Sequence, residues 1–148
     1  MNLDRDQEPD GQPESGVPRF SKRAARRLIQ RAFVLAGRDK HLRQHIREAH
    51  LTTRWVLRDW ELAWTVLISH GHIEFDRRPA KHPDLTLTWE NASDFFTHAE
   101  TGAPLPEEVV LEGDPALRRF SEPVYKAFFR SLGSVLRYPV DEQGESLL

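Results

Sequence analysis

Apolar residues recur at intervals of three and four in the stretch after residue 20, which is the spacing of one helix face. The members of this stripe are Ala25, Leu28, Ile29, Ala32, Phe33 and Ala36. Ser21 is a typical N-cap and Gly37 a typical helix stop, so a helix is predicted between them. A second helical stretch is predicted over residues 38–50, and its apolar members are Leu42, Ile46 and Ala49.

The apolar period falls to two after residue 50, which indicates strands. Two strands are predicted over residues 51–59 and 61–69, followed by a hairpin turn at His70-Gly71 and a short third strand. A fourth strand is predicted over residues 85–90, where clean alternation implies one buried and one solvent-facing side. Its buried side is assigned to Leu85, Leu87 and Trp89, and its solvent side to Thr86, Thr88 and Glu90.

Helix signals return in the last third of the chain. Asn91 is expected to cap a short helix that ends within residues 102–106, and a fifth strand follows over 109–112. Asp114 is typical of a helix start, and Pro123 should kink or split that helix. The apolar stripe beyond the proline comprises Val124, Ala127, Phe128, Leu132 and Val135. This order predicts an α+β domain with a five-stranded, mainly antiparallel sheet and helices on one face.

The chain has 148 residues, enough for one hydrophobic core. We divide it into an acidic leader over 1–18, a basic amphipathic segment over 19–50, a core over 51–138 and a tail over 139–148. The leader lacks the apolar content that would offset the entropy of ordering, so we expect it to be disordered. The polar tail is expected to fray.

Charge is segregated along the chain, although its formal total is only -2. The leader carries a net -4, residues 19–50 carry +8 and the remaining residues carry -6. A concentrated basic helix attracts an anionic membrane surface or an acidic enzyme partner even on a near-neutral protein. The side chains assigned to this membrane or partner binding are Lys22, Arg23, Arg26, Arg27 and Arg31. Leu28, Ile29 and Phe33 opposite these charges favour a membrane surface, and no nucleic-acid motif is present.

Several chemistries are excluded by what the sequence lacks. The absence of cysteine excludes disulfides, thiol nucleophiles and cysteine-based metal sites, and it fits a reducing cytoplasm. Nucleophile-elbow, Walker and dinucleotide-binding motifs are also missing. The histidine pairs at 41/45 and 70/72 have no identifiable third ligand. We therefore predict no catalytic residue, no metal and no cofactor.

The middle of the chain resembles the sterol carrier protein type two family over residues 50–122. The features that carry the resemblance are the strand and glycine turn at 64–71, the Pro-Asp-Leu-Thr-Leu-Thr run at 83–88, Ala-Ser-Asp-Phe-Phe at 92–96 and Val-Leu-Glu-Gly-Asp at 110–114. Residues 58–64, Arg-Asp-Trp-Glu-Leu-Ala-Trp, look most like a bacterial accessory factor of oxygen-independent ubiquinone biosynthesis. Two departures are His70-Gly71, where Asp-Gly or Asn-Gly is usual, and the break at Pro123.

The resemblance implies an apolar tunnel between sheet and helices that holds a lipid tail, with no catalytic residues. One wall is assigned to Trp64, Val66, Ile68, Leu87 and Trp89. The opposite wall is assigned to Phe95, Phe96, Phe120, Val124 and Phe128. Such side chains often close-pack completely, and the sequence alone leaves a filled or a hollow interior open.

The leading hypothesis is a non-enzymatic lipid-binding accessory protein, cytoplasmic and able to associate with a membrane surface. It would hold a prenylated quinone precursor or another isoprenoid or acyl molecule and present it to biosynthetic enzymes. The first alternative is a protein-interaction domain without a small ligand. The second is a hydrolase or isomerase that uses His98 or His82.

Overall fold

The computed structural model describes residues 20–101 and 109–148. The leader at 1–18 and the expected helix end at 102–106 lie outside the described residues. The elements, in chain order, are α1 (Lys22–Ala36), α2 (Lys40–His45), β1 (His50–Leu57), β2 (Leu62–Ser69), β3 (His72–Asp76), β4 (Leu85–Trp89), α3 (Ala92–Thr101), β5 (Val110–Gly113), α4 (Pro115–Phe120) and α5 (Glu122–Arg137). A 3₁₀ turn, Arg58–Trp60, joins β1 to β2.

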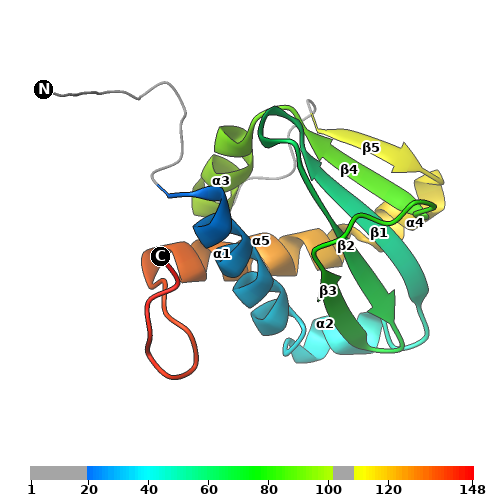
Figure 1. The fold of residues 1–148 in the computed structure, drawn as a ribbon. Coiled ribbons are helices and arrows are strands. Elements are labelled where there is room, and N and C mark those ends of the chain that lie inside the picture. The colour runs from blue at the N-terminus through cyan, green and yellow to red at the C-terminus, as the bar shows by residue number, and fades with distance from the viewer. Residues whose placement is uncertain (1–19, 102–108) are drawn as a thin grey trace, which may run out of the picture.

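The strands form one five-stranded sheet in the order β3-β2-β1-β4-β5. The β1–β2, β2–β3 and β4–β5 pairs are antiparallel, whereas β1 and β4 are parallel. Helices α1, α3 and α5 cover one face of this sheet (Figure 1). The α+β class, the strand number and the mainly antiparallel pairing predicted from the sequence are therefore confirmed.

Two predicted helix caps are confirmed by their hydrogen bonds. The Ser21 Oγ accepts from the Ala24 N–H at 3.1 Å, and the Asp114 Oδ1 accepts from the Ala116 N–H at 2.7 Å. Pro123 splits the last helical region as expected, because α4 ends at Phe120 and the proline sits in the first turn of α5. A proline there costs no hydrogen bond.

The second helix is shorter than the predicted stretch over 38–50. It begins after Asp39, whose carboxylate accepts from the Leu42 N–H at 3.0 Å, and it ends at His45. Beyond the helix end, two backbone carbonyls accept hydrogen bonds from the β2–β3 turn. The Ile46 carbonyl accepts from the Gly71 N–H at 3.0 Å, and the Ala49 carbonyl accepts from the His70 N–H at 2.8 Å.

The cap of α3 differs from the prediction. The Asn91 side chain donates to Asp94 at 3.3 Å instead of accepting from the helix. The first backbone N–H of the helix, at Ala92, instead donates to the Asp59 carboxylate at 2.9 Å. Asp59 belongs to the 3₁₀ turn after β1, so this cap ties α3 to the end of the sheet.

Strand β4 was predicted to have one solvent-facing side, and the structure contradicts this. Thr86 and Thr88 are only 6% exposed each. Their strand lies inside the sheet, so β1 flanks them on one side and β5 on the other. Short threonine side chains between two such neighbours are shielded even on the face that the helices leave open.

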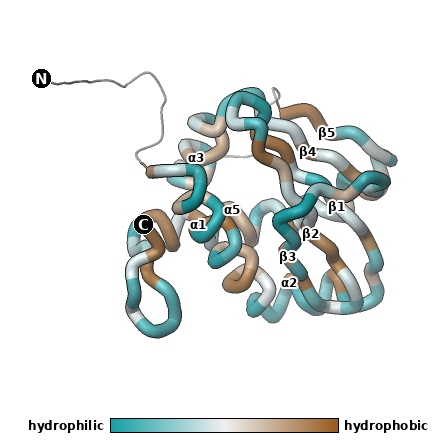
Figure 2. Tube along the Cα trace, in the orientation of Figure 1, coloured by the Kyte–Doolittle hydropathy of each residue, from teal (hydrophilic) through white to brown (hydrophobic). Residues whose placement is uncertain are grey.

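The polar tail over 139–148 was expected to fray, yet it folds back on the molecule. Val140 and Ser146 form an isolated antiparallel bridge, and Leu147 is buried. The Leu147 carbonyl accepts from the Arg27 Nε at 2.8 Å, which anchors the tail to α1. Figure 2 shows that the turn of this segment is hydrophilic.

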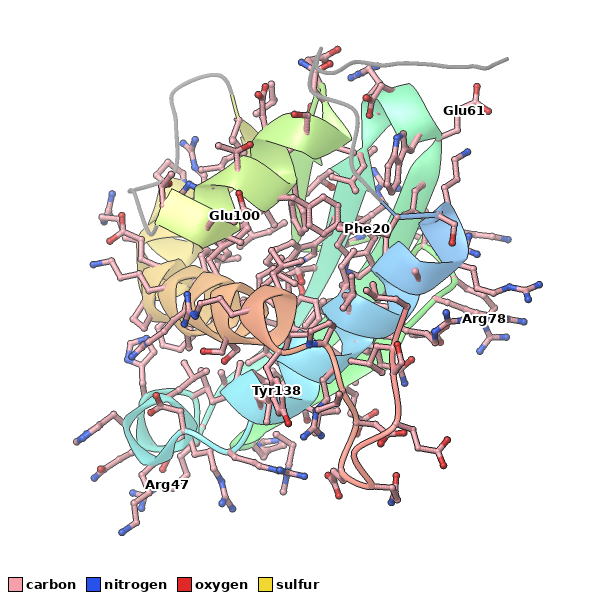
Figure 3. The ribbon with its side chains drawn as sticks, turned by 90° about the vertical axis from the view of Figure 1, so that its left-hand side faces the viewer. Phe20, Arg47, Glu61, Arg78, Glu100 and Tyr138 are labelled. Carbon is pink, nitrogen blue, oxygen red and sulfur yellow. The ribbon has the colours of Figure 1, made fainter. Side chains whose placement is uncertain are left out.

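The basic segment over 19–50 shares one hydrophobic core with the residues that follow. Leu28, Ile29 and Phe33 of α1 are at most 1% exposed and pack in the same cluster as the sheet and α5. Side chains from the helices and strands fill the space between the two layers, whereas Arg47, Glu61 and Arg78 extend outwards (Figure 3). No helix among the described residues is long and apolar enough to cross a membrane.

Candidate functional site

The inner face of the sheet carries a row of three tryptophans on adjacent strands. Trp64 of β2 pairs directly with Trp55 of β1, and Trp89 of β4 lies on the other side. The ring centroids of Trp55 and Trp64 are 6.1 Å apart, and those of Trp55 and Trp89 are 5.6 Å apart, both stacked. All three residues are at most 2% exposed, so the row forms the floor of the space beneath the helices.

Phenylalanines from three helices face this row. Phe95 of α3 meets Trp89 edge-on at 5.0 Å between ring centroids, and Phe128 of α5 meets Trp55 at the same distance. Phe33 of α1 stacks on Phe128 at 4.1 Å. Edge-to-face and offset-stacked contacts at these distances are favourable ring arrangements. The two predicted walls therefore touch where these rings meet.

Nine of the ten residues predicted to line a tunnel lie in this interior. They are Trp64, Val66, Ile68, Leu87, Trp89, Phe95, Phe96, Val124 and Phe128, and all are buried in one hydrophobic cluster. Phe96 lies towards its edge, against Phe20 at 4.9 Å between ring centroids.

Phe120, the tenth predicted residue, lies outside the buried cluster. It is half-buried and packs against the edge of the cluster. Its ring stacks on His45 at 4.5 Å, and its carbonyl accepts from the His45 Nε2 at 2.7 Å. Phe120 ends α4, which packs against β5 and α5, so its ring reaches α2 instead of the tryptophan row.

Sequence reasoning missed four central rings of the interior. Trp55, Phe33, Tyr125 and Phe129 were not assigned to either wall, although all are at most 4% exposed. For Trp55 a signal was present, because Leu51, Thr53, Trp55 and Leu57 alternate with residues of the opposite face. Phe33 was on a recognised stripe, but that stripe was assigned to membrane docking.

The three indole N–H groups of the row differ in their hydrogen bonding. The Trp55 Nε1 donates to the Thr53 Oγ1 at 3.0 Å, and that hydroxyl donates to the Val66 carbonyl at 2.8 Å. The Trp64 and Trp89 Nε1 atoms are buried without a hydrogen-bond acceptor in the described part of the chain. A buried donor left unpaired costs about 1–3 kcal/mol, so these two positions favour an acceptor atom.

Two titratable side chains, Tyr125 within the interior and His98 at its edge, have pKa values that burial shifts towards the neutral form. Burial lowers the pKa of His98, whose ring packs edge-on against Phe129 at 4.3 Å. Burial also raises the pKa of Tyr125 to about 12. Both shifts follow from the cost of placing a charge in an apolar environment. The candidate site is therefore an apolar interior filled by packed rings. His82, the other histidine considered for catalysis, lies on the loop before β4, away from this interior.

The basic side chains predicted to bind a membrane or partner lie on α1. Lys22, Arg23, Arg26 and Arg27 lie on its outer side and are all exposed, although the Arg27 Nε also donates to the Leu147 carbonyl. Arg31 is half-buried and pairs with Glu142 at 3.3 Å. The apolar face opposite them is occupied by the core, so it is not available for insertion into a lipid surface. The charged face of α1 is the part of this helix that stays exposed.

Comparison with known proteins adds evidence at the level of the fold. No protein-family model matches the sequence, and no curated protein is significantly similar. A conserved hypothetical protein of Thermus thermophilus, described as a candidate sterol carrier protein, matches 90% of this chain and 94% of its own. That alignment has 13% identity and a TM-score of 0.50.

Two further solved structures are similar to parts of this chain. A ubiquinone synthesis protein described as UbiJ-SCP2 matches 64% of this chain and 84% of its own, at 15% identity and a TM-score of 0.44. The inverting sec-alkylsulfatase Pisa1 of a Pseudomonas species matches 72% of this chain and 18% of its own, at 22% identity and a TM-score of 0.49.

The Thermus thermophilus match spans nearly all of both chains. The protein therefore has a sterol-carrier-type α+β fold, as the resemblance of residues 50–122 implied.

Proposed function

We propose that this protein is a non-enzymatic carrier that holds the apolar chain of a lipid between the sheet and helices α1, α3 and α5. The cargo would be a prenylated quinone precursor or another isoprenoid or acyl molecule, which the protein presents to biosynthetic enzymes. The sterol-carrier-type fold supports this class of function. The uncharged, ring-lined interior supplies the environment that such a chain requires.

The observation that carries the proposal is the pair of unpaired indole N–H groups in the interior. Trp64 and Trp89 place these donors on either side of Trp55, and the described part of the chain offers them no acceptor. A carbonyl or hydroxyl oxygen on a mainly apolar cargo would accept from them. A quinone-type head has such oxygens, whereas a plain hydrocarbon would leave both donors unpaired.

The cargo must separate rings that now touch. Phe95 and Phe128 contact the tryptophan row, so the helices that carry them would move away from the sheet when a chain enters. Burying a methylene group yields about 0.8 kcal/mol, and about ten of them offset the costs of ordering and of parting the rings. A long isoprenoid or acyl tail meets this requirement.

We place the carrier in oxygen-independent ubiquinone biosynthesis, on the resemblance carried by residues 58–64. It would work in the cytoplasm and dock peripherally on an anionic membrane or an acidic enzyme partner. The exposed charges of Lys22, Arg23 and Arg26 on α1 support this docking, although the last two also line a groove that a soluble anion could occupy instead.

A titration with a short-chain prenylated quinone tests the proposal. Quenching of tryptophan fluorescence should saturate, since three of the four tryptophans lie in the interior. Trp64→Phe and Trp89→Phe keep an aromatic ring and remove the donor, so each should weaken binding about tenfold or less. Trp60→Phe, outside the row, is the matched control and should bind like the wild type.

A protein-interaction domain without a ligand is the second candidate function. The contact between the walls favours it, because Trp89 and Phe95 already pack edge-on. In that case the quinone would give no saturable quenching in the wild type or in any tryptophan variant. Saturable binding that only the two interior substitutions weaken would reject this candidate.

A further inference from the structure

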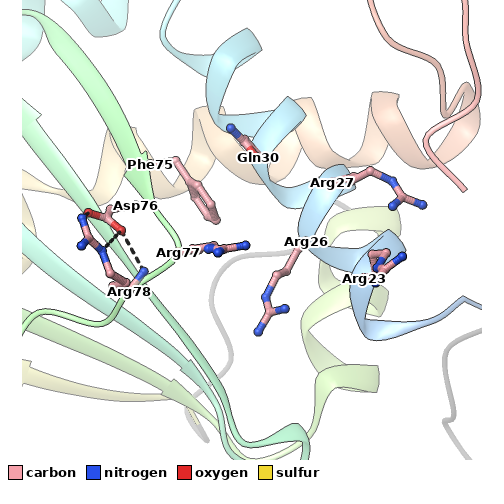
Figure 4. Close-up of a pocket in the computed structure, with 8 residues that line it drawn as sticks. All are labelled: Arg23, Arg26, Arg27, Gln30, Phe75, Asp76, Arg77 and Arg78. Carbon is pink, nitrogen blue, oxygen red and sulfur yellow. Dashed lines mark hydrogen bonds and ion pairs between the residues drawn. The ribbon is translucent and has the colours of Figure 1, made fainter.

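A groove of about 550 Å³ lies between helix α1 and the edge strand β3, outside the apolar interior. Arg23, Arg26 and Arg27 line it from the helix, and Arg77 and Arg78 line it from the residues after β3. The three helix arginines were predicted from the sequence to bind an anionic surface or partner, whereas Arg77 and Arg78 were not. Figure 4 shows Arg26 and Arg77 projecting into the gap between the two elements.

The positive charge of the groove is only partly neutralised. Asp76, its acidic member, is paired with Arg78 at 3.1 Å, and the hydrogen bond from Arg78 lowers the pKa of Asp76. The Arg27 Nε is held by the Leu147 carbonyl. Arg26 and Arg77 form no ion pair with any residue in 20–101 or 109–148. Within that part of the chain, these two guanidinium groups are left to bind an anion.

The fold holds both walls of the groove in place before any ligand arrives. Helix α1 is fixed by its buried apolar face, and β3 pairs with β2. The segment after β3 is tied to the sheet, because the Thr65 Oγ1 donates to the Arg78 carbonyl at 2.6 Å. Phe75 packs below on Phe33 and Trp64, so its ring separates the groove from the apolar interior.

We propose that this groove binds a small soluble molecule through its phosphomonoester or diphosphate group. A guanidinium group matches two phosphate oxygens at once, and arginines from two facing elements can hold one multivalent anion between them. The volume falls within the range of small-molecule sites, and the concave shape suits a compact anion better than a flat bilayer. Gln30, also in the lining, adds a neutral donor. The proposal goes beyond the carrier function, since the groove lies outside the apolar interior.

Calorimetric titration of the full chain with inorganic diphosphate tests the groove. Binding should be saturable, with one diphosphate per chain, and it should weaken as salt is added. The double variant Arg26→Gln, Arg77→Gln should lose about tenfold or more in affinity. Both side chains reach into the groove without an ion pair to the described residues, so the variant should keep the wild-type circular dichroism spectrum and melting temperature.

The matched control is the double variant Arg43→Gln, Arg47→Gln. It makes the same change of charge at two exposed arginines away from the groove, and it should bind diphosphate within about twofold of the wild type. Equal losses in the two double variants would show diffuse attraction instead of a site and would overturn the proposal. A titration without saturable heat at millimolar diphosphate would also overturn it.

A vesicle sedimentation experiment distinguishes binding of a soluble ligand from binding of a lipid headgroup. The protein is sedimented with vesicles of phosphatidylcholine containing phosphatidylglycerol, in the presence and absence of diphosphate. Diphosphate binding without vesicles supports the proposal. Vesicle binding that depends on Arg26 and Arg77 while free diphosphate neither binds nor competes would assign the groove to membrane docking and overturn it. Quinone binding is measured on the same Arg26→Gln, Arg77→Gln variant. It tests the carrier function separately, because both substitutions lie outside the apolar interior.

Discussion

The apolar interior and the basic groove share helix α1 and strand β3 but differ in what their side chains do. Helix α1 turns Leu28 and Phe33 into the core and Arg26 into the groove. Phe75 of β3 packs against the core rings from beneath the groove. The interior is apolar and buried, whereas the groove is lined by charged side chains and exposed.

The interior and the groove therefore contribute to different properties of the protein, the first to stability and the second to anion binding. Buried rings contribute to folding through the apolar area that they remove from water. Exposed arginines contribute little to folding, because surface ion pairs are worth about 0–1 kcal/mol, but they select anions. We therefore expect interior substitutions to change stability first, and groove substitutions to change binding alone.

The largest effect is expected for Phe128→Ala. This ring contacts Trp55, Phe33 and other core rings with no exposed surface, so its loss leaves a cavity. The free energy of unfolding should fall by about 3–5 kcal/mol in urea denaturation. Tyr138→Ala, at a ring that is 73% exposed, is the control and should cost less than about 0.5 kcal/mol. Equal losses would mean that the core is not the source of stability.

Gly133→Ala tests how closely the helices over the interior approach each other. A Cβ at this position of α5 would lie 2.7 Å from the Ala99 carbonyl oxygen of α3. The helices must separate, and the free energy of unfolding should fall by about 1–3 kcal/mol. Ser134→Ala, one residue along on the exposed side, should be near neutral in the same measurement. Unchanged stability of the glycine variant would show that α3 and α5 are not tightly packed.

The pH dependence of stability tests whether burial in the interior disfavours the charged form of His98. Because burial lowers the pKa of His98 from 6.5, its contribution to stability is present above pH 6.5 and is lost as pH falls towards the folded pKa. Denaturation midpoints of the wild type should therefore drop more between about pH 7 and pH 5 than those of His98→Gln. His82→Gln, at a loop position outside the core, should keep the wild-type profile. Identical profiles for wild type and His98→Gln would contradict a charge-excluding interior.

The smallest effect on stability is expected for Asp76→Asn. The carboxylate is exposed, so removing its pair with Arg78 should leave the denaturation midpoint unchanged. The same change frees Arg78 and should tighten diphosphate binding in the calorimetric titration. Weaker binding of diphosphate by Asp76→Asn would argue that the carboxylate is needed to position Arg78.

The features that could be predicted from the sequence depend on interactions between residues close together in the chain. Ser21, Asp114 and Pro123 act on the residues next to them, so their roles could be inferred without a fold. Alternation along β2 was equally informative, because one of its faces meets the helices and the other does not. The buried members of this pattern, Trp64 and Ile68, were assigned correctly to the interior face.

Features that depend on distant partners were missed. Asp59 caps a helix whose first residue lies far along the chain, and Thr86 is buried because β1 and β5 flank it. The groove needs α1 beside β3, and no local pattern places Arg77 opposite Arg26. Phe120 is as apolar as the interior residues, but the direction of α4 places its ring against His45 instead of in the interior.

Native mass spectrometry of the purified full chain tests the carrier role most directly. We predict a population heavier than the bare chain by the mass of one lipid, released by organic solvent and identified as an isoprenoid or acyl compound. A single species at the mass of the chain, unchanged after incubation with prenylated quinone, would contradict the claim that rings from the two layers part to admit a guest.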